Sequence, residues 1–369
     1  MKPKPNIVHL PVYKPGTSKE EVKKRFGIED VIKLASNENP FGCSPAVREA
    51  LVDEFDRMSE YPDGASVELT HALSKHLNVE PNQIIFGNGS DEVVLMIARA
   101  YLQPGDETIM AVPTFPQYKH NAEVEGATVI EVPLKNGVHD LEEMVRRVTE
   151  RTKIIWICNP NNPTGTMNTH EEMVAMLEKV PQDVLVVLDE AYYEYVADPD
   201  YPDSLSLIQK YPNVLVLRTF SKIYGLAALR IGYGIGRAEV IHTINQVREP
   251  FNTSRFAQRA ALVALKDQAF IEDCRQKNLE GISYLSEQFE KLGLKYFPTV
   301  ANFIMVDVAR PAKDVYEGLL EKGIIVRGGH NLGMPTHLRV TVGSREQNEK
   351  FIAALEQVLQ QVPAAGIAK

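Results

Sequence analysis

The chain has 369 residues and a formal net charge of −9, with 44% hydrophobic and 24% charged residues. This is the composition of a soluble globular protein, and a chain of this length predicts two domains rather than one core. The negative charge argues against nucleic acid as the main partner, and no apolar run approaches the roughly 20 residues that cross a bilayer. The opening residues lead into no apolar signal region, so we expect a cytoplasmic location.

Residues 1–45 are rich in proline and irregular in pattern, so we expect an arm that must pack on another part of the molecule. A large domain is predicted for residues 46–248, because short apolar runs alternate there with helix-length segments. This alternation predicts a mainly parallel sheet with helices on both faces. The strands are expected at 83–86, 108–112, 128–132, 153–158, 183–188, 214–217 and 231–235.

The turn at Gly89, Ser90 and Asp91 precedes the apolar segment 93–100, where we expect a helix to begin. Free N–H groups and the positive end of the helix dipole make such a helix start suitable for an anion. Ordinary capping by Ser90 or Asp91 is an alternative explanation, and both can hold together.

Polar side chains follow two of the predicted buried strands. Asn162 lies in the Asn-Pro-Asn-Asn-Pro-Thr-Gly turn after 154–158, and Asp189 comes directly after 184–188. Open α/β sheets bind ligands at the carboxyl ends of their strands, so these groups are candidate ligand contacts. Taken singly, each is equally well explained as a helix cap or a plain turn.

Lys222 follows the predicted strand 214–217, with Ser221 beside it and Arg230 eight residues later. Lysine amines form Schiff bases with carbonyl cofactors, while serine and arginine supply hydrogen-bond donors to phosphate. An aldehyde that is also a phosphate, pyridoxal 5′-phosphate, satisfies both requirements. The spacing alone is weak, since a solvated lysine and an arginine in a surface ion pair produce it too.

Beyond residue 248 the pattern changes to longer helical stretches at 254–265 and 271–292. Strands are then expected at 301–308, 323–326 and 337–342, which predicts a smaller α+β domain over 249–369. No metal site is expected, because the three cysteines are far apart and the histidines show no H-x-x-x-H spacing.

The order Asn-Pro-Thr-Gly, Asp-x-x-Tyr, Ser-Lys and Arg resembles the fold-type I pyridoxal-phosphate aminotransferases over nearly the whole chain. That resemblance implies a large domain with a seven-stranded sheet. It makes Lys222 the Schiff-base lysine, Asp189 the partner of the ring nitrogen and Tyr192, with Asn162, a partner of the ring oxygen. It also implies that the phosphate is bound by Ser221, Arg230 and the Gly89–Asp91 turn. It predicts that Phe115 stacks on the pyridine, with Tyr118 as the second choice.

The arm motifs at 10–13, 33–42 and 61–63 resemble the histidinol-phosphate aminotransferases. By that resemblance, Tyr61 reaches the phosphate in a neighbouring subunit's site, which implies a homodimer. Tyr13, Arg327 and Arg339, with Asn162, would bind the substrate. The implied reaction is a ping-pong transfer through Lys222 between histidinol phosphate and 2-oxoglutarate, in histidine biosynthesis.

Three alternatives remain at this stage. An aromatic-amino-acid aminotransferase would share every cofactor residue, and both activities can coexist in one enzyme. A threonine-phosphate decarboxylase-like lyase would share the anion-binding arginines. A transcription regulator on the same scaffold would need a basic helix-turn-helix domain of about 60 residues, whereas only about 30 residues precede the family's core here. Arg327 is also explained equally well as a solvated loop residue.

Overall fold

The structure is a computed structural model that describes residues 1–12 and 15–364. Its main sheet has seven strands in the order β2-β8-β7-β6-β5-β3-β4. β8 runs antiparallel to β2 and β7, and the remaining pairs are parallel, which confirms the predicted mainly parallel sheet. The bounds are β2 Ile84–Gly87, β3 Glu107–Val112, β4 Thr128–Pro133, β5 Thr152–Cys158, β6 Leu185–Asp189, β7 Val214–Thr219 and β8 Gly232–Gly236.

Helices cover both faces of this sheet. Successive side chains of a central strand point to opposite faces, and here they are apolar on both. On β5, Ile155 and Ile157 belong to one core, and Ile154 and Trp156 to the other. One face carries α4 Ser90–Tyr101, α5 Gln117–Glu125 and α9 Ala238–Asn245. The other carries α2 Pro45–Val52, α3 Val67–Leu77, α6 Leu141–Arg146, α7 His170–Leu177, α8 Ser204–Lys210 and α10 Arg255–Ala264.

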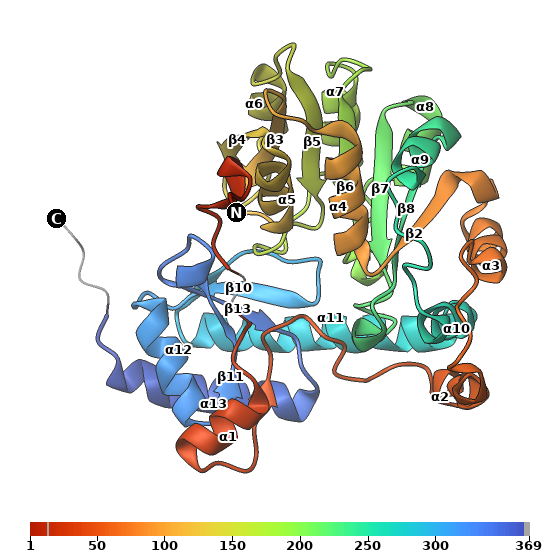
Figure 1. Cartoon of the computed structure of the whole chain (residues 1–369). Helices are drawn as coiled ribbons and strands as arrows, with labels where there is room; N and C mark the ends of the chain where they lie inside the picture. Colours follow the sequence, from red (N-terminus) through yellow and green to blue (C-terminus); the bar gives the residue numbers. More distant parts are fainter. Residues whose placement is uncertain (13–14, 365–369) are drawn as a thin grey trace.

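A smaller α+β unit packs below the large sheet (Figure 1). Its antiparallel sheet has the order β12-β13-β10-β9, and a separate two-stranded sheet pairs β1 with β11. The elements are β9 Lys295–Tyr296, β10 Phe303–Asp307, α12 Ala312–Glu321, β11 Ile324–Ile325, β12 Arg327–Gly328, β13 His337–Thr341 and α13 Arg345–Gln361. Short 3₁₀ turns complete the chain at Pro5–Ile7, Phe55–Arg57, Pro81–Gln83, Tyr193–Tyr195, Ala227–Leu229 and Gly329–Asn331.

Helix α11, Gln268–Lys291, connects the two units and runs beneath the large sheet (Figure 1). Its first turns place Ile271 and Cys274 in the core of the large domain, and its last turns place Leu285 and Phe289 in the core of the small domain. The predicted boundary at residue 249 precedes α10, which packs on α2 and α3. We therefore propose that the two domains meet within α11.

The arm is more regular than expected, since α1 spans Lys19–Phe26. The Ser18 hydroxyl accepts a hydrogen bond from the Glu21 N–H, and Gly27 ends the helix in the left-handed conformation. Strand β1, Ile32–Lys33, pairs with β11 of the small domain, while Asn6 donates to two carbonyls of α5 in the large domain. The arm thus spans both domains. No helix among the described residues is long and apolar enough to cross a membrane.

Candidate active site

A cavity of about 220 Å³ lies where the large sheet, the small domain and the arm meet. Cys158, Asp189 and Thr219, the last residues of β5, β6 and β7, form its floor. Parallel neighbouring strands end at one edge of the sheet, which brings the polar residues that follow them together. The remaining lining residues are Ser36, Asn37, Ser90, Asp91, Phe115, Asn162, Ala191, Tyr192, Ser221, Lys222, Arg230 and Arg339.

Lys222 lies in the turn that follows β7, and its amine reaches the cavity. The amine donates a long hydrogen bond of 3.4 Å to the Ser36 carbonyl of the arm, and it lies 5.6 Å from the centre of the Tyr192 ring. Burial, followed by the positive charges of Arg339 and Arg230, lowers the pKa of Lys222 to about 8. A substantial share of this amine is therefore neutral near pH 8, the form that attacks a carbonyl.

Asp189 is 3% exposed, and protein donors hold its carboxylate in place. The Tyr118 hydroxyl donates to Oδ2 at 2.6 Å, and the Ala191 N–H donates to Oδ1 at 3.2 Å. Burial raises the pKa of Asp189 to about 6, while the Tyr118 hydrogen bond lowers it. Asp189 lies at the end of a buried strand, so the alternative of a helix-capping acid is wrong.

Arg339, on β13 of the small domain, crosses to the large domain. Its Nη1 donates to Asn162 Oδ1 at 2.6 Å and its Nη2 donates to the Ala35 carbonyl at 2.7 Å, while its Nε is buried without a partner among the described residues. Burial and the charge of Arg327 lower the pKa of Arg339 to about 10, and the group remains cationic at neutral pH. Arg339 therefore offers a buried positive charge with an unused donor.

The start of α4 forms a second positive corner of the cavity. Gly89 precedes the helix, and no side chain caps it, so its first N–H groups are free. The structure therefore does not show the capping by Ser90 or Asp91 that the sequence offered as an alternative. Arg230 donates to Ser221 Oγ at 3.3 Å and pairs with Asp91 at 3.1 Å. Gly89 has φ of 79°, the left-handed region that favours glycine, and a side chain there would also press on the Arg230 guanidinium.

Among the described residues, two predicted ligand-binding side chains, those of Tyr61 and Arg327, do not line this cavity. Tyr61 is 77% exposed and stacks on Phe251, with ring centroids 4.7 Å apart. Arg327 lies directly opposite Arg339 in the β12–β13 pair, but it lines a neighbouring cavity of about 1240 Å³ together with residues of the arm. Tyr13 lies outside the described residues.

The sequence interpretation missed two polar partners of the site. Asn37 Nδ2 donates to the Tyr192 hydroxyl at 2.9 Å, although Asn37 had been noted only as part of an arm motif. Tyr118, the second choice for ring stacking, lies behind Asp189 and stacks on Trp156 with centroids 5.0 Å apart, whereas Phe115 lines the cavity. The buried Tyr118 hydroxyl needs a partner, but its sequence position does not say which one.

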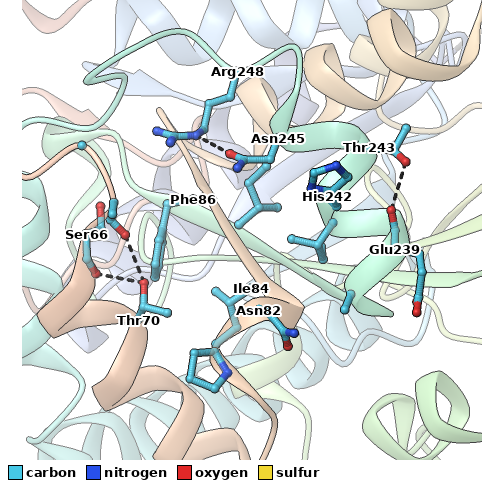
Figure 2. Close-up of a pocket in the computed structure, with 16 residues that line it drawn as sticks. Ser66, Thr70, Asn82, Ile84, Phe86, Glu239, His242, Thr243, Asn245 and Arg248 are labelled. Atoms are coloured by element: carbon cyan, nitrogen blue, oxygen red, sulfur yellow. Dashed lines mark hydrogen bonds between the residues drawn. The ribbon is translucent and has the colours of Figure 1, made fainter.

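A further cavity, of about 690 Å³, opens beside the edge strand β2 (Figure 2). Its polar groups largely bond one another: Arg248 donates to Asn245, Thr243 to the Glu239 carbonyl and Thr70 to the Ser66 carbonyl. The cavity contains no lysine and no buried carboxylate. Among residues 1–12 and 15–364, no group of three or more His, Cys, Asp or Glu side chains is arranged to hold a metal ion. The strand-end cavity is therefore the candidate active site.

The sequence of this chain matches the model of the family "Aminotransferase class I and II" over residues 29–355. The chain belongs to this aminotransferase family. A histidinol-phosphate aminotransferase of Brevibacillus brevis is 52% identical to this aminotransferase over 97% of the chain and 99% of the relative. A histidinol-phosphate aminotransferase of a Geobacillus strain is 54% identical, over 98% of the chain and 99% of the relative.

Among solved structures, the histidinol-phosphate aminotransferase of Sinorhizobium meliloti in complex with pyridoxal-5′-phosphate is similar to this aminotransferase. The TM-score is 0.89 and the identity 28%, over 97% of each chain. The expected fold and family are thereby confirmed.

Proposed function

We propose that this aminotransferase moves an amino group between L-histidinol phosphate and 2-oxoglutarate in histidine biosynthesis, with pyridoxal 5′-phosphate bound at Lys222. One observation carries the proposal: an amine of lowered pKa, a buried carboxylate and an uncapped helix start meet in a single cavity. The relatives of about half-identical sequence, named for this activity, support the choice of substrate. A cytoplasmic location stays a prediction.

The residues of the cavity fit the cofactor in chemistry. The free N–H groups of α4, with Ser221 and Arg230, would hold its phosphate. Asp189 would accept a hydrogen bond from the protonated ring nitrogen, and Asn162 and Tyr192, which line the same cavity, would be the partners of the ring oxygen. The face of Phe115 would cover the ring.

Each group then has a defined task. Pyridoxal phosphate, when bound, supplies a protonated ring that withdraws electrons from the substrate's α-carbon. The charge of Asp189 keeps that proton on the ring nitrogen, because Tyr118 and the Ala191 N–H favour the ionised carboxylate. Lys222, with a pKa near 8, takes the α-proton as a neutral amine and returns it as a general acid.

Arg339 would bind the anionic end of the substrate. Its guanidinium is buried and lines the cavity, its Nε has no hydrogen-bond partner among the described residues, and its Nη1 donates to Asn162. A two-pronged guanidinium suits carboxylate and phosphate alike, so one residue serves glutamate and histidinol phosphate in turn. Arg327 adjoins Arg339 on the neighbouring strand, where a second charge would favour the phosphate dianion.

We also propose that the active unit is a homodimer to which Tyr61 contributes across the interface. Exposed apolar side chains lie close to Tyr61 in the sequence, at Val52, Phe55, Met58 and Val67, and the exposed Phe251 stacks on its ring. Exposed apolar surface of this kind is typical of a protein interface. Mixing Tyr61→Ala and Lys222→Ala subunits should restore activity, because one of the two hybrid sites carries both native residues. An active monomer in sedimentation analysis would contradict the shared site.

The substrate is tested by single-turnover rates of the cofactor-loaded enzyme with histidinol phosphate, phenylalanine and threonine phosphate. We expect the fastest amino transfer with histidinol phosphate. Faster reaction with phenylalanine would support the aromatic aminotransferase instead, and release of CO₂ from threonine phosphate would support the lyase.

A further inference from the structure

Asn37 connects the arm, the small domain and Tyr192 through a chain of buried hydrogen bonds. Asn37 is 1% exposed, and its backbone lies in the left-handed region with φ of 55°, which asparagine tolerates better than most residues. Its N–H donates to Thr341 Oγ1 at 3.0 Å, and its carbonyl accepts from Asn302 Nδ2 at 3.0 Å. These bonds hold the Asn37 backbone in place on the small domain.

The side-chain bonds set the direction of each proton. The Thr341 hydroxyl donates to Asn37 Oδ1 at 3.0 Å, which leaves Nδ2 as the group that faces Tyr192. Nδ2 donates to the Tyr192 oxygen at 2.9 Å, so that oxygen acts as the acceptor in this bond. The hydroxyl proton of Tyr192 must then point elsewhere, and Tyr192 lines the cavity. The opposite amide orientation would turn that proton toward Asn37 and away from a ligand.

Tyr192 keeps its proton in this environment. Burial raises the pKa of its phenol above the ordinary value, and the charges that face it are Lys222, 5.6 Å from the ring centre, with Arg339 and Asp189. A neutral phenol whose oxygen already accepts one hydrogen bond is a donor to whatever occupies the cavity. This donor faces the same space as the Lys222 amine and the Asp189 carboxylate.

We propose that Asn37 is a positioning residue that orients the Tyr192 hydroxyl as a hydrogen-bond donor to the ring oxygen of the cofactor. The inference rests on the proposed binding of pyridoxal phosphate at Lys222. Thr341 fixes the orientation of the Asn37 amide, and it lies two residues from Arg339 on β13, on the same face of that strand. The strand that carries the substrate-binding arginine therefore also determines how Tyr192 meets the cofactor.

The coloured adduct of lysine and cofactor provides a direct measurement, because its absorbance changes with the proton shared between the lysine nitrogen and the ring oxygen. A hydrogen bond donated by Tyr192 stabilises the ring oxygen most when that proton has left, so it lowers the pKa of the adduct. Removing or reversing the Asn37 contact should raise this pKa by about one unit, the scale of one charged hydrogen bond.

Asn37→Asp and Asn37→Gly are the two matched variants, since aspartate and glycine also accept the left-handed backbone. Aspartate accepts a hydrogen bond from the Tyr192 hydroxyl and so reverses the contact, while glycine removes it. We expect both to raise the titration midpoint of the cofactor-loaded enzyme, Asn37→Asp more than Asn37→Gly. In a Tyr192→Phe background neither should raise it further. Thr341→Val, which frees the amide to rotate, should give a smaller shift in the same direction.

A midpoint equal to wild type in Asn37→Asp, Asn37→Gly and Thr341→Val would overturn the inference. Equal shifts with and without the Tyr192 hydroxyl would also overturn it, because the effect would then be one of charge alone. If wild type forms no coloured adduct with Lys222, the proposed function itself fails, and this outcome is distinct from an adduct whose titration is unaffected by Asn37.

Discussion

The floor of the active site and its cover are built in different ways. The floor consists of residues at the ends of β5, β6 and β7, which one sheet brings together through regular pairing, such as Cys158 opposite Asp189. The cover consists of Ser36 and Asn37 from the arm and Arg339 from the small domain, which reach the site only through long-range contacts. The floor follows from local sequence order, whereas the cover depends on how two domains and the arm meet.

This difference assigns different tasks to the two regions. The floor and the turns beside it carry Asp189, Lys222 and the donors proposed for the phosphate, which would be needed for any amino donor. The cover carries Arg339, proposed to bind the substrate, and Asn37, proposed to orient Tyr192. Changes in the floor should therefore damage all substrates alike, whereas discrimination between substrates should arise at the cover and the residues beside it, such as Arg327.

The largest effect is expected for Lys222→Ala, a change in the floor. The variant loses both the attachment point of the cofactor and the general base, so multiple turnover should fall by more than about a thousandfold for every substrate. Steady-state rates of wild type, Lys222→Ala and the exposed control Lys210→Ala on α8 test this expectation. Near-normal turnover by Lys222→Ala would show that Lys222 takes no part in the reaction.

Asp189→Asn should be the next most damaging change. It keeps the shape but removes the charge that holds a proton on the ring nitrogen, so proton removal from the substrate should slow by at least about a hundredfold. Cofactor affinity should fall as well. The control is Asp183→Asn, an exposed acid just before the same strand. If both variants turned over normally, Asp189 would be a structural carboxylate only.

Arg339 in the cover and Arg327 beside it should differ in their effect on the two substrates. Arg327→Ala should weaken use of histidinol phosphate about ten- to hundredfold and leave an aromatic amino acid nearly unaffected, as the loss of about 1.5–3 kcal/mol from one charged hydrogen bond predicts. Arg339→Ala should damage both substrates. The exposed Arg345→Ala serves as the control. Equal losses for both substrates in Arg327→Ala would mean that Arg327 does not recognise phosphate.

The pH dependence of cofactor attachment should give the smallest effect. The pKa of Lys222 is lowered from 10.5 to about 8, so the amine is protonated below that pH and neutral above it. The rate at which the cofactor-free enzyme takes up pyridoxal phosphate should rise about tenfold per pH unit up to about pH 8 and then level off. A rate that keeps rising toward pH 10.5 would indicate an ordinary exposed lysine.

Much of the floor was predictable because short apolar runs mark buried strands. All seven predicted ranges overlap a strand of the large sheet, and the polar residues that follow them lie in one cavity. The cover was predicted less well. Helix α1 was missed although Ser18 and Gly27 mark its ends, and the Asn37–Tyr192 bond joins residues 155 positions apart. No local pattern specifies a contact of that separation, and the role proposed for Tyr61 requires a second subunit.

The most direct test of the floor is the chemical identity of the lysine that holds the cofactor. The enzyme incubated with pyridoxal phosphate should be yellow, and borohydride reduction should fix the cofactor's mass on the peptide that contains Lys222. We expect this single labelled peptide in wild type and none in Lys222→Ala. A label on any other lysine, or a protein that stays colourless with the cofactor, would contradict the account.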